Sequence, residues 1–207
     1  DQKFGIGLGC NGIIHVLIEP IDFTSEVNPM ELLKKAISDR QPSFLVILFS
    51  LSNSQGKQIG TALLAKSGEL IGNKGIVSSE QIQLIEASIE NVNSSEKSLI
   101  PPIALGEFTL FLERIRPSIR ILLFGAGNDT IPLVEIGSKF GIEILLIDGR
   151  VSHATKQRFP QVKEILVGPA DEVSFEQFID QQTVALLMTH NFDYESVLLA
   201  RLMKFDL

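Results

Sequence analysis

Four apolar runs of strand length in the second half of the chain constrain its fold most strongly. They are "IRILLF", "IEILLI", "EILV" and "TVALLM", at residues 119–124, 142–147, 164–167 and 183–188. Their apolarity is continuous rather than alternating, which is typical of strands that are buried on both faces. Stretches compatible with helices separate the runs. This half therefore predicts a parallel sheet built from βαβ units.

The first half follows a different pattern. Asn28 before Pro29 is a helix start, and Ser78 has capping-box spacing to Gln81. The expected elements are a strand over 15–21, a helix over 28–40, a hairpin over 44–65, a helix over 78–93 and a strand over 106–115. We therefore predict an α/β chain, with an N-terminal α+β domain over 1–117 and a Rossmann-like parallel-sheet domain over 118–207.

Composition excludes several classes of protein. The 207 residues carry a net charge of −7 and no cluster of lysine or arginine, which is unlike a DNA- or RNA-binding protein. No apolar run approaches the ~18 residues needed to cross a bilayer, so we expect a soluble chain without a membrane partner. A single cysteine cannot form an internal disulfide, and a cytoplasmic location is expected. The three histidines lie far apart in sequence, and we predict no protein-ligated metal.

A glycine-rich turn follows the first of the four apolar runs. "GAGNDT" at 125–130 leads into a helical pattern, the order of a dinucleotide-binding unit in which Gly125 makes the turn and Gly127 admits a phosphate. Asp148 ends the second run, 21 residues after Gly127 and near the ~20-residue offset of an acid that binds a ribose. Arg150 either pairs with a phosphate or is a solvated loop charge. These residues predict a nucleotide-type site; the alternative is a Rossmann-like scaffold with another ligand or none.

Polar residues also follow the fourth apolar run. "MTHN" at 188–191 places Thr189 and His190 at the carboxyl end of a strand, where open α/β sheets bind ligands. The alternative for His190 is a hydrogen-bonded structural residue. Asn191 or Asp193 is expected to cap the helix that follows.

The single cysteine lies in a second glycine-rich segment, "GIGLGCNGIIHVLIEP" at 5–20. A row of backbone N–H groups there would form an anion-binding nest, which also stabilises the thiolate of Cys10. The residues alone favour the alternative, a small side chain that fills a tight turn. His15 is interpreted as packing, and Glu19 faces either this site or solvent.

Four ordered segments are together more specific than any one of these motifs. They are "GLGCNGIIHVLIEPI", "FLERIRPSIRILLFGAGNDTIPLVEIGSKFGIEILLIDGR", "RFP" and "LLMTHNFDYESVLLARL". In this order they resemble the XdhC/CoxI family of molybdenum-enzyme accessory proteins, over nearly the whole chain. The family also has an earlier Gly-Cys-Val-Glu segment and a later Tyr-Ile-Gly-x-Leu-Gly segment, both absent here. The resemblance implies a member trimmed at both ends.

The resemblance implies a role in maturing xanthine dehydrogenase-type or carbon monoxide dehydrogenase-type molybdoenzymes. The resemblance implies a chaperone that holds the molybdenum cofactor (molybdopterin) while the cofactor is sulfurated and inserted. Its implied partners are the target molybdoenzyme and a cysteine desulfurase. Matched position by position, the cofactor-binding residues are Gly9, Cys10, Gly12, Glu19, Gly125, Gly127, Asp148, Arg150, Thr189 and His190. No nucleophile, base and orienter set is recognisable, so no catalytic residue is assigned. Asn11 and Thr130 depart from the family pattern, which has glycine and alanine there.

Two other hypotheses remain at this point. One is an NAD(P)-dependent oxidoreductase that uses the GAGNDT loop, with His190 as an acid or base. The other is an interaction scaffold whose pocket has lost its ligand. The cofactor hypothesis requires the loops of Cys10 and Gly127 to converge on one cleft. An antiparallel edge in the first half would also allow a homodimer.

Overall fold

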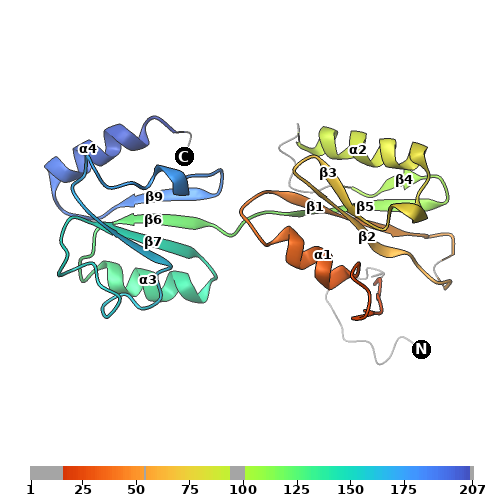
Figure 1. Cartoon of the computed structure of the whole chain (residues 1–207), viewed down its shortest axis with the longest axis horizontal. Helices are drawn as coiled ribbons and strands as arrows, with labels where there is room; N and C mark the ends of the chain where they lie inside the picture. The colour runs from red at the N-terminus through yellow and green to blue at the C-terminus, as the bar shows by residue number, and fades with distance from the viewer. Residues whose placement is uncertain (1–15, 54, 94–100, 206–207) are drawn as a thin grey trace, which may run out of the picture. The chain divides into compact units, whose positions relative to one another are not determined.

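The structure is a computed structural model that describes residues 16–53, 55–93 and 101–205. The chain divides into two compact units, Asp1–Arg116 and Pro117–Leu207 (Figure 1). Within the described ranges, no helix is both long and apolar enough to cross a membrane.

The first unit contains an antiparallel sheet. Its strands are β1 (Ser43–Phe49), β2 (Gly60–Lys66), β3 (Glu69–Gly72), β4 (Ile103–Leu105) and β5 (Phe108–Ile115). They lie in the order β3-β2-β1-β5-β4, and each neighbouring pair is antiparallel. The predicted hairpin is therefore confirmed as β1 and β2, and the predicted strand over 106–115 as β5. The short strands β3 and β4 were not predicted.

Two helices cover opposite faces of this sheet (Figure 1). Helix α1 (Pro29–Ala36) begins where the Asn28 side chain accepts from the N–H groups of Met30 and Glu31. Helix α2 (Ser79–Asn93) follows a short 3₁₀ turn, η1 (Lys74–Ile76). Alternate residues of β1 divide between the two cores: Val46 packs in the core beneath α2, and Leu45 packs beneath α1. Both predicted helices and the α+β character of this half are confirmed.

The strand predicted at the start of the chain is wrong over residues 16–21, which form no regular element. These residues contact the antiparallel sheet through the side chain of Glu19. The carboxylate of Glu19 accepts hydrogen bonds from the backbone N–H and the hydroxyl of Thr61, at 2.7 and 2.9 Å. Pro20 lacks an N–H, which disfavours a continuous ladder at this point.

The second unit contains the predicted parallel sheet. Its strands are β6 (Arg120–Phe124), β7 (Glu143–Asp148), β8 (Glu164–Val167) and β9 (Thr183–Leu187), in the order β8-β7-β6-β9. All three neighbouring pairs are parallel. The chain moves from β6 to one side of the sheet and then returns to pair β9 on the other side. This reversal makes a topological switch point between β6 and β9.

Helices α3 (Thr130–Lys139) and α4 (Phe192–Leu202) cover opposite faces of the parallel sheet (Figure 1). Val134 of α3 packs in the core that contains Leu123, and Leu198 of α4 packs in the core that contains Leu122. The central strands β6 and β7 are thus buried on both faces, as their continuous apolarity indicates. The edge strands β8 and β9 are only partly buried, so that expectation is wrong for them. The segments after β7 and β8 contain turns and one 3₁₀ turn, η2 (Glu176–Phe178), in place of the expected helices.

Candidate functional site

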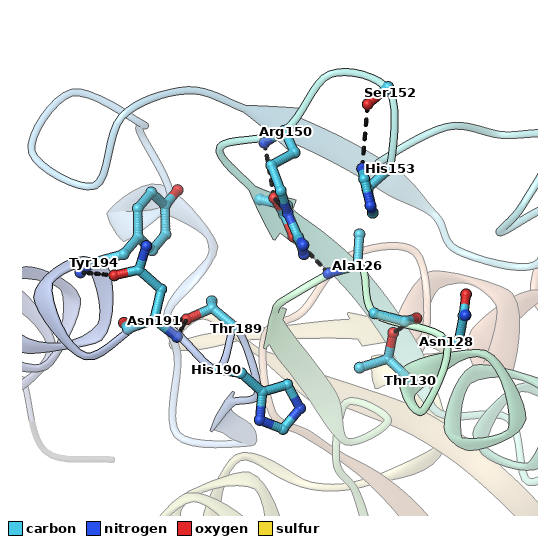
Figure 2. A network of polar contacts seen from close by, with 12 residues as sticks. Ala126, Asn128, Thr130, Arg150, Ser152, His153, Thr189, His190, Asn191 and Tyr194 are labelled. Carbon is cyan, nitrogen blue, oxygen red and sulfur yellow. Dashed lines mark hydrogen bonds and ion pairs between the residues drawn. The ribbon is translucent and has the colours of Figure 1, made fainter.

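The candidate site lies where β6, β7 and β9 end, which we call the carboxyl edge. It comprises residues 125–130 after β6, Asp148 at the end of β7 with residues 149–153 that follow, and residues 188–195 after β9. Figure 2 shows polar side chains of all three segments gathered there. Six of the predicted site residues lie in these segments: Gly125, Gly127, Asp148, Arg150, Thr189 and His190.

Gly125 allows the ends of β6 and β9 to approach closely. Its φ is +127°, and a β-carbon there would lie 2.3 Å from the carbonyl oxygen of Met188. The N–H of Gly125 donates to Ile147 on β7 at 2.8 Å, and the N–H of Met188 donates to Phe124 at 2.7 Å. A residue without a side chain is required here because of a backbone contact within the protein.

Gly127 is covered by the side chain of Asp129. A β-carbon built at Gly127 would lie 2.2 Å from Asp129 Oδ1. Asp129 immediately precedes α3, but its side chain makes no capping hydrogen bond. The hydroxyl of Thr130 instead donates to the carbonyl of Gly127 at 2.9 Å. The glycine loop thus carries a carboxylate of its own beside its second glycine.

Asp148 is a buried acid with an exposed fraction of 2%. Its Oδ2 accepts from the N–H of Ala126 at 2.6 Å, and its Oδ1 accepts from the N–H of Arg150 at 2.7 Å. Burial alone would raise the pKa of Asp148. The hydrogen bonds from Arg150 and Ala126 outweigh burial and hold that pKa below its usual range.

Arg150 binds Asp148 through one side of its guanidinium. Nε donates to Oδ1 at 2.9 Å and Nη2 donates to Oδ2 at 2.7 Å, while the side chain remains 47% exposed. The pKa of Arg150 is raised chiefly by its hydrogen bond to Asp148. Buried Asp148 therefore orients a charged and half-exposed guanidinium at the carboxyl edge.

Thr189 and His190 form the turn between β9 and α4. Glu195 Oε1 accepts from the N–H and the hydroxyl of Thr189, at 2.7 and 2.9 Å, and from the N–H of His190 at 3.2 Å. The φ of His190 is +56°, which is uncommon outside glycine. Its Nε2 lies 2.9 Å from Asp129 Oδ2. This contact joins the end of β9 to the glycine loop after β6.

Comparison with known proteins places this arrangement in a family. Residues 121–207 match the family described as "XdhC Rossmann domain". The chain is also 24% identical over 199 residues to a probable xanthine dehydrogenase component of Bacillus subtilis (strain 168), covering 96% of this chain and 54% of that protein. Residues 121–207 are therefore an XdhC Rossmann domain.

A solved structure has a similar fold over most of the chain. It is described as a xanthine dehydrogenase from Bacillus halodurans, with 23% identity and a TM-score of 0.61, and it covers 86% of this chain and 47% of that one. This chain therefore spans about half the length of these two relatives.

Two residues of the carboxyl edge were not predicted. Arg158 of the "RFP" segment donates to the carbonyl of Ala126 and to Asn128 Oδ1, both at 2.8 Å, and to the carbonyl of His153 at 2.7 Å. It therefore ties the glycine loop to the segment after β7. Glu195 orders the turn after β9. The RFP segment, which is part of the family resemblance, could have indicated Arg158. For Glu195 the sequence offers only an acid in the first turn of the helix that follows Thr189 and His190.

The remaining XdhC-motif residues belong to the first unit. Gly9, Cys10 and Gly12 lie outside the described residues, so their predicted contact with the cofactor stays a prediction. Glu19 is half-buried against Thr61, within the first unit.

The alternative capping role of Asn191 is confirmed, because its side chain accepts from the N–H of Tyr194 at 3.1 Å.

Proposed function

We propose that this chain, which carries an XdhC Rossmann domain, is an accessory protein in the maturation of xanthine dehydrogenase-type molybdoenzymes. In this role it binds the molybdenum cofactor as cargo, supports its sulfuration and insertion, and catalyses no turnover of its own. The match of residues 121–207 to the XdhC Rossmann domain supports the accessory role. The names of both relatives refer to xanthine dehydrogenase, which supports such an enzyme as the partner.

The arrangement of Asp148 and Arg150 carries the cofactor-binding part of the proposal. Molybdopterin is a pterin with a phosphate group, and a guanidinium is well suited to bind a phosphate. Nε and Nη2 of Arg150 are engaged by Asp148, and Nη1 has no hydrogen-bond partner among the described residues. A guanidinium fixed on one side and half exposed on the other loses little freedom when it binds an anion. Arg150 would therefore hold the phosphate.

Other groups at the carboxyl edge supply polar contacts for the pterin. The side chains of His153, Thr189 and Asn191 come from the segments after β7 and β9 (Figure 2). Within the first unit, Cys10 with Gly9, Gly12 and Glu19 is proposed from the resemblance of their motif to bind cofactor, and the thiol of Cys10 would handle sulfur from a cysteine desulfurase.

The oxidoreductase alternative has weaker support from the geometry. A Rossmann dinucleotide site needs an acid that is free to accept from a ribose. Both carboxylate oxygens of Asp148 already accept from protein donors, and Asp148 is buried. We therefore propose cofactor binding in place of hydride transfer.

The test measures retained cofactor. The protein is mixed anaerobically with molybdenum cofactor released from a purified molybdoenzyme and then desalted, and molybdenum and pterin are measured together. We expect the wild-type chain to retain both. We expect Arg150→Gln to lower retention at least tenfold. Arg150→Lys should give an intermediate value, because lysine keeps the charge but cannot form the paired hydrogen bonds of a guanidinium with a carboxylate.

Lys204→Gln is the matched control, since Lys204 is an exposed cation beyond the end of α4. It should retain cofactor as the wild type does. Folding of each variant is checked by the emission of Tyr194, the single tyrosine of a chain that has no tryptophan. Wild-type retention by folded Arg150→Gln would contradict the role of Arg150, and no retention by the wild type would contradict cofactor binding itself.

A further inference from the structure

The glycine loop of the parallel sheet carries an acid where a Rossmann dinucleotide site receives a phosphate. In such a site the second glycine lets the pyrophosphate approach the backbone. Here the second glycine is Gly127, and Asp129 Oδ1 lies 2.2 Å from the position of its missing β-carbon. A pyrophosphate that approached Gly127 would therefore meet a carboxylate oxygen before it met the loop backbone.

Two contacts keep this carboxylate in place. His190 Nε2 lies 2.9 Å from Asp129 Oδ2, so the acid is tied to the segment after β9. The backbone of His190 is fixed in turn, because Glu195 accepts from its N–H at 3.2 Å. His190 holds a φ of +56°, a conformation that persists where its surroundings over-determine it. Asp129 is thus one member of an anchored chain of contacts from Gly127 to α4.

The charge of Asp129 opposes a second anion at this position. Its hydrogen bond from His190 lowers the pKa of the carboxyl group, which keeps it ionised at neutral pH. Like charges within a few ångströms repel each other, and the repulsion is stronger near a protein surface than in bulk water. A bound pyrophosphate would have to displace the carboxylate and break its contact with His190.

We propose that Asp129 is a specificity-determining residue that excludes pyrophosphate-bearing dinucleotides such as NAD(P) from the glycine loop. The loop keeps the shape of a dinucleotide site, but its phosphate position is taken by the protein's own acid. This inference concerns the glycine loop alone and does not depend on molybdenum-cofactor binding.

The test is a gain of dinucleotide binding in the full chain. NADH and NADPH are titrated into the wild type, Asp129→Ser and Asp129→Asn, with nicotinamide fluorescence and calorimetry as readouts. We expect no saturable binding by the wild type up to about 1 mM dinucleotide. We expect Asp129→Ser to bind dinucleotide with a Kd at least tenfold below that concentration. Asp129→Asn, which removes the charge but keeps the bulk, should gain less.

Two further variants make the result specific. Asp193→Asn removes an exposed acid from the first turn of α4, at the same edge, and should bind dinucleotide no better than the wild type. His190→Asn keeps a residue that tolerates positive φ but removes the imidazole, so it should release Asp129 and give a partial gain. Wild-type binding of NADH with a Kd below about 10 µM would overturn the proposal. The proposal would also be overturned if every folded variant of Asp129 and His190 bound dinucleotide no more tightly than the wild type does.

Discussion

At the scale of the residue, Asp148 shows how one buried acid can organise a site. Its position at the end of a parallel strand suggests a ribose ligand. Its two oxygens instead accept from the backbone of Ala126 and from Arg150, which joins the loops after β6 and β7. A charge with 2% exposure is tolerated because each oxygen is hydrogen-bonded and a guanidinium lies beside it. The acid therefore acts through the groups that it positions.

The stability of the second unit should depend on pH through Asp148. The pKa of Asp148 is lower in the folded state than in the unfolded chain, so the unfolded state binds more protons as pH falls. The stabilisation is fully present above the unfolded value of about 4 and is lost as pH falls toward the folded value. Urea unfolding followed by Tyr194 emission between pH 7 and pH 3 should show this decline.

Asp148→Asn provides the comparison for that pH profile. At pH 7 it should be less stable by about 2 kcal/mol, since asparagine loses the ionic contact with Arg150 while it can still accept a hydrogen bond. Its free energy of unfolding should also fall less steeply below pH 4, with the remaining slope due to other acids of lowered pKa, such as Glu143 and Glu176. An unchanged slope would show that Asp148 does not contribute to the pH dependence.

The sequence predicted which residues reach the carboxyl edge but not how they pair. Gly125, Asp148 and His190 were found because parallel strands end at one edge of a sheet, so residues that follow them are brought together. The contact between His190 and Asp129 spans 61 residues, and no local pattern encodes it. Asp129 is visible in the sequence two residues after Gly127, but the contact with His190 that holds its carboxylate could not be predicted.

At the scale of the element, periodicity was sufficient for the buried strands and capped helices. Continuous apolar runs identified β6 to β9, and Asn28 identified the start of α1. Periodicity failed for segments whose placement depends on contacts with distant residues or whose strands are very short. Residues 16–21 have a strand-like composition but contact the sheet through Glu19, and β4 is only three residues long. The segments after β7 and β8 replace helices with turns that still bury Phe159 and Phe175.

The approach of β6 to β9 should depend on Gly125. Gly125→Ala would place a β-carbon 2.3 Å from a backbone oxygen and keep a φ of +127°, so we expect a loss of about 3 kcal/mol or more. Gly141→Ala is the control, because Gly141 has a φ of +70° with open space around it and should lose only about 1 kcal/mol. Urea unfolding followed by Tyr194 emission gives both values. Equal losses would show that the strand ends can separate at little cost.

At the scale of the whole molecule, the hydrophobic cores follow the division into two units. Among the described residues, the cores beneath α1 and α2 contain only residues before Pro117, and the cores beneath α3 and α4 contain only residues after it. Every hydrogen bond described above for the carboxyl edge also lies within the second unit. The Rossmann match begins at residue 121, close to the same division. The groups that order the carboxyl edge are therefore all encoded within one unit.

A segment of residues 117–207 should consequently fold by itself. Its parallel sheet is covered on both faces by its own helices and loops, so removing the first unit leaves these cores intact. We expect a cooperative thermal transition by circular dichroism, with a Tyr194 emission change at the same temperature. The Asp148→Asn segment is the internal comparison, because it should shift the transition to lower temperature as it does in the full chain. A segment without a cooperative transition would show that the first unit supplies contacts that this sheet requires, and the carboxyl edge would then depend on both units.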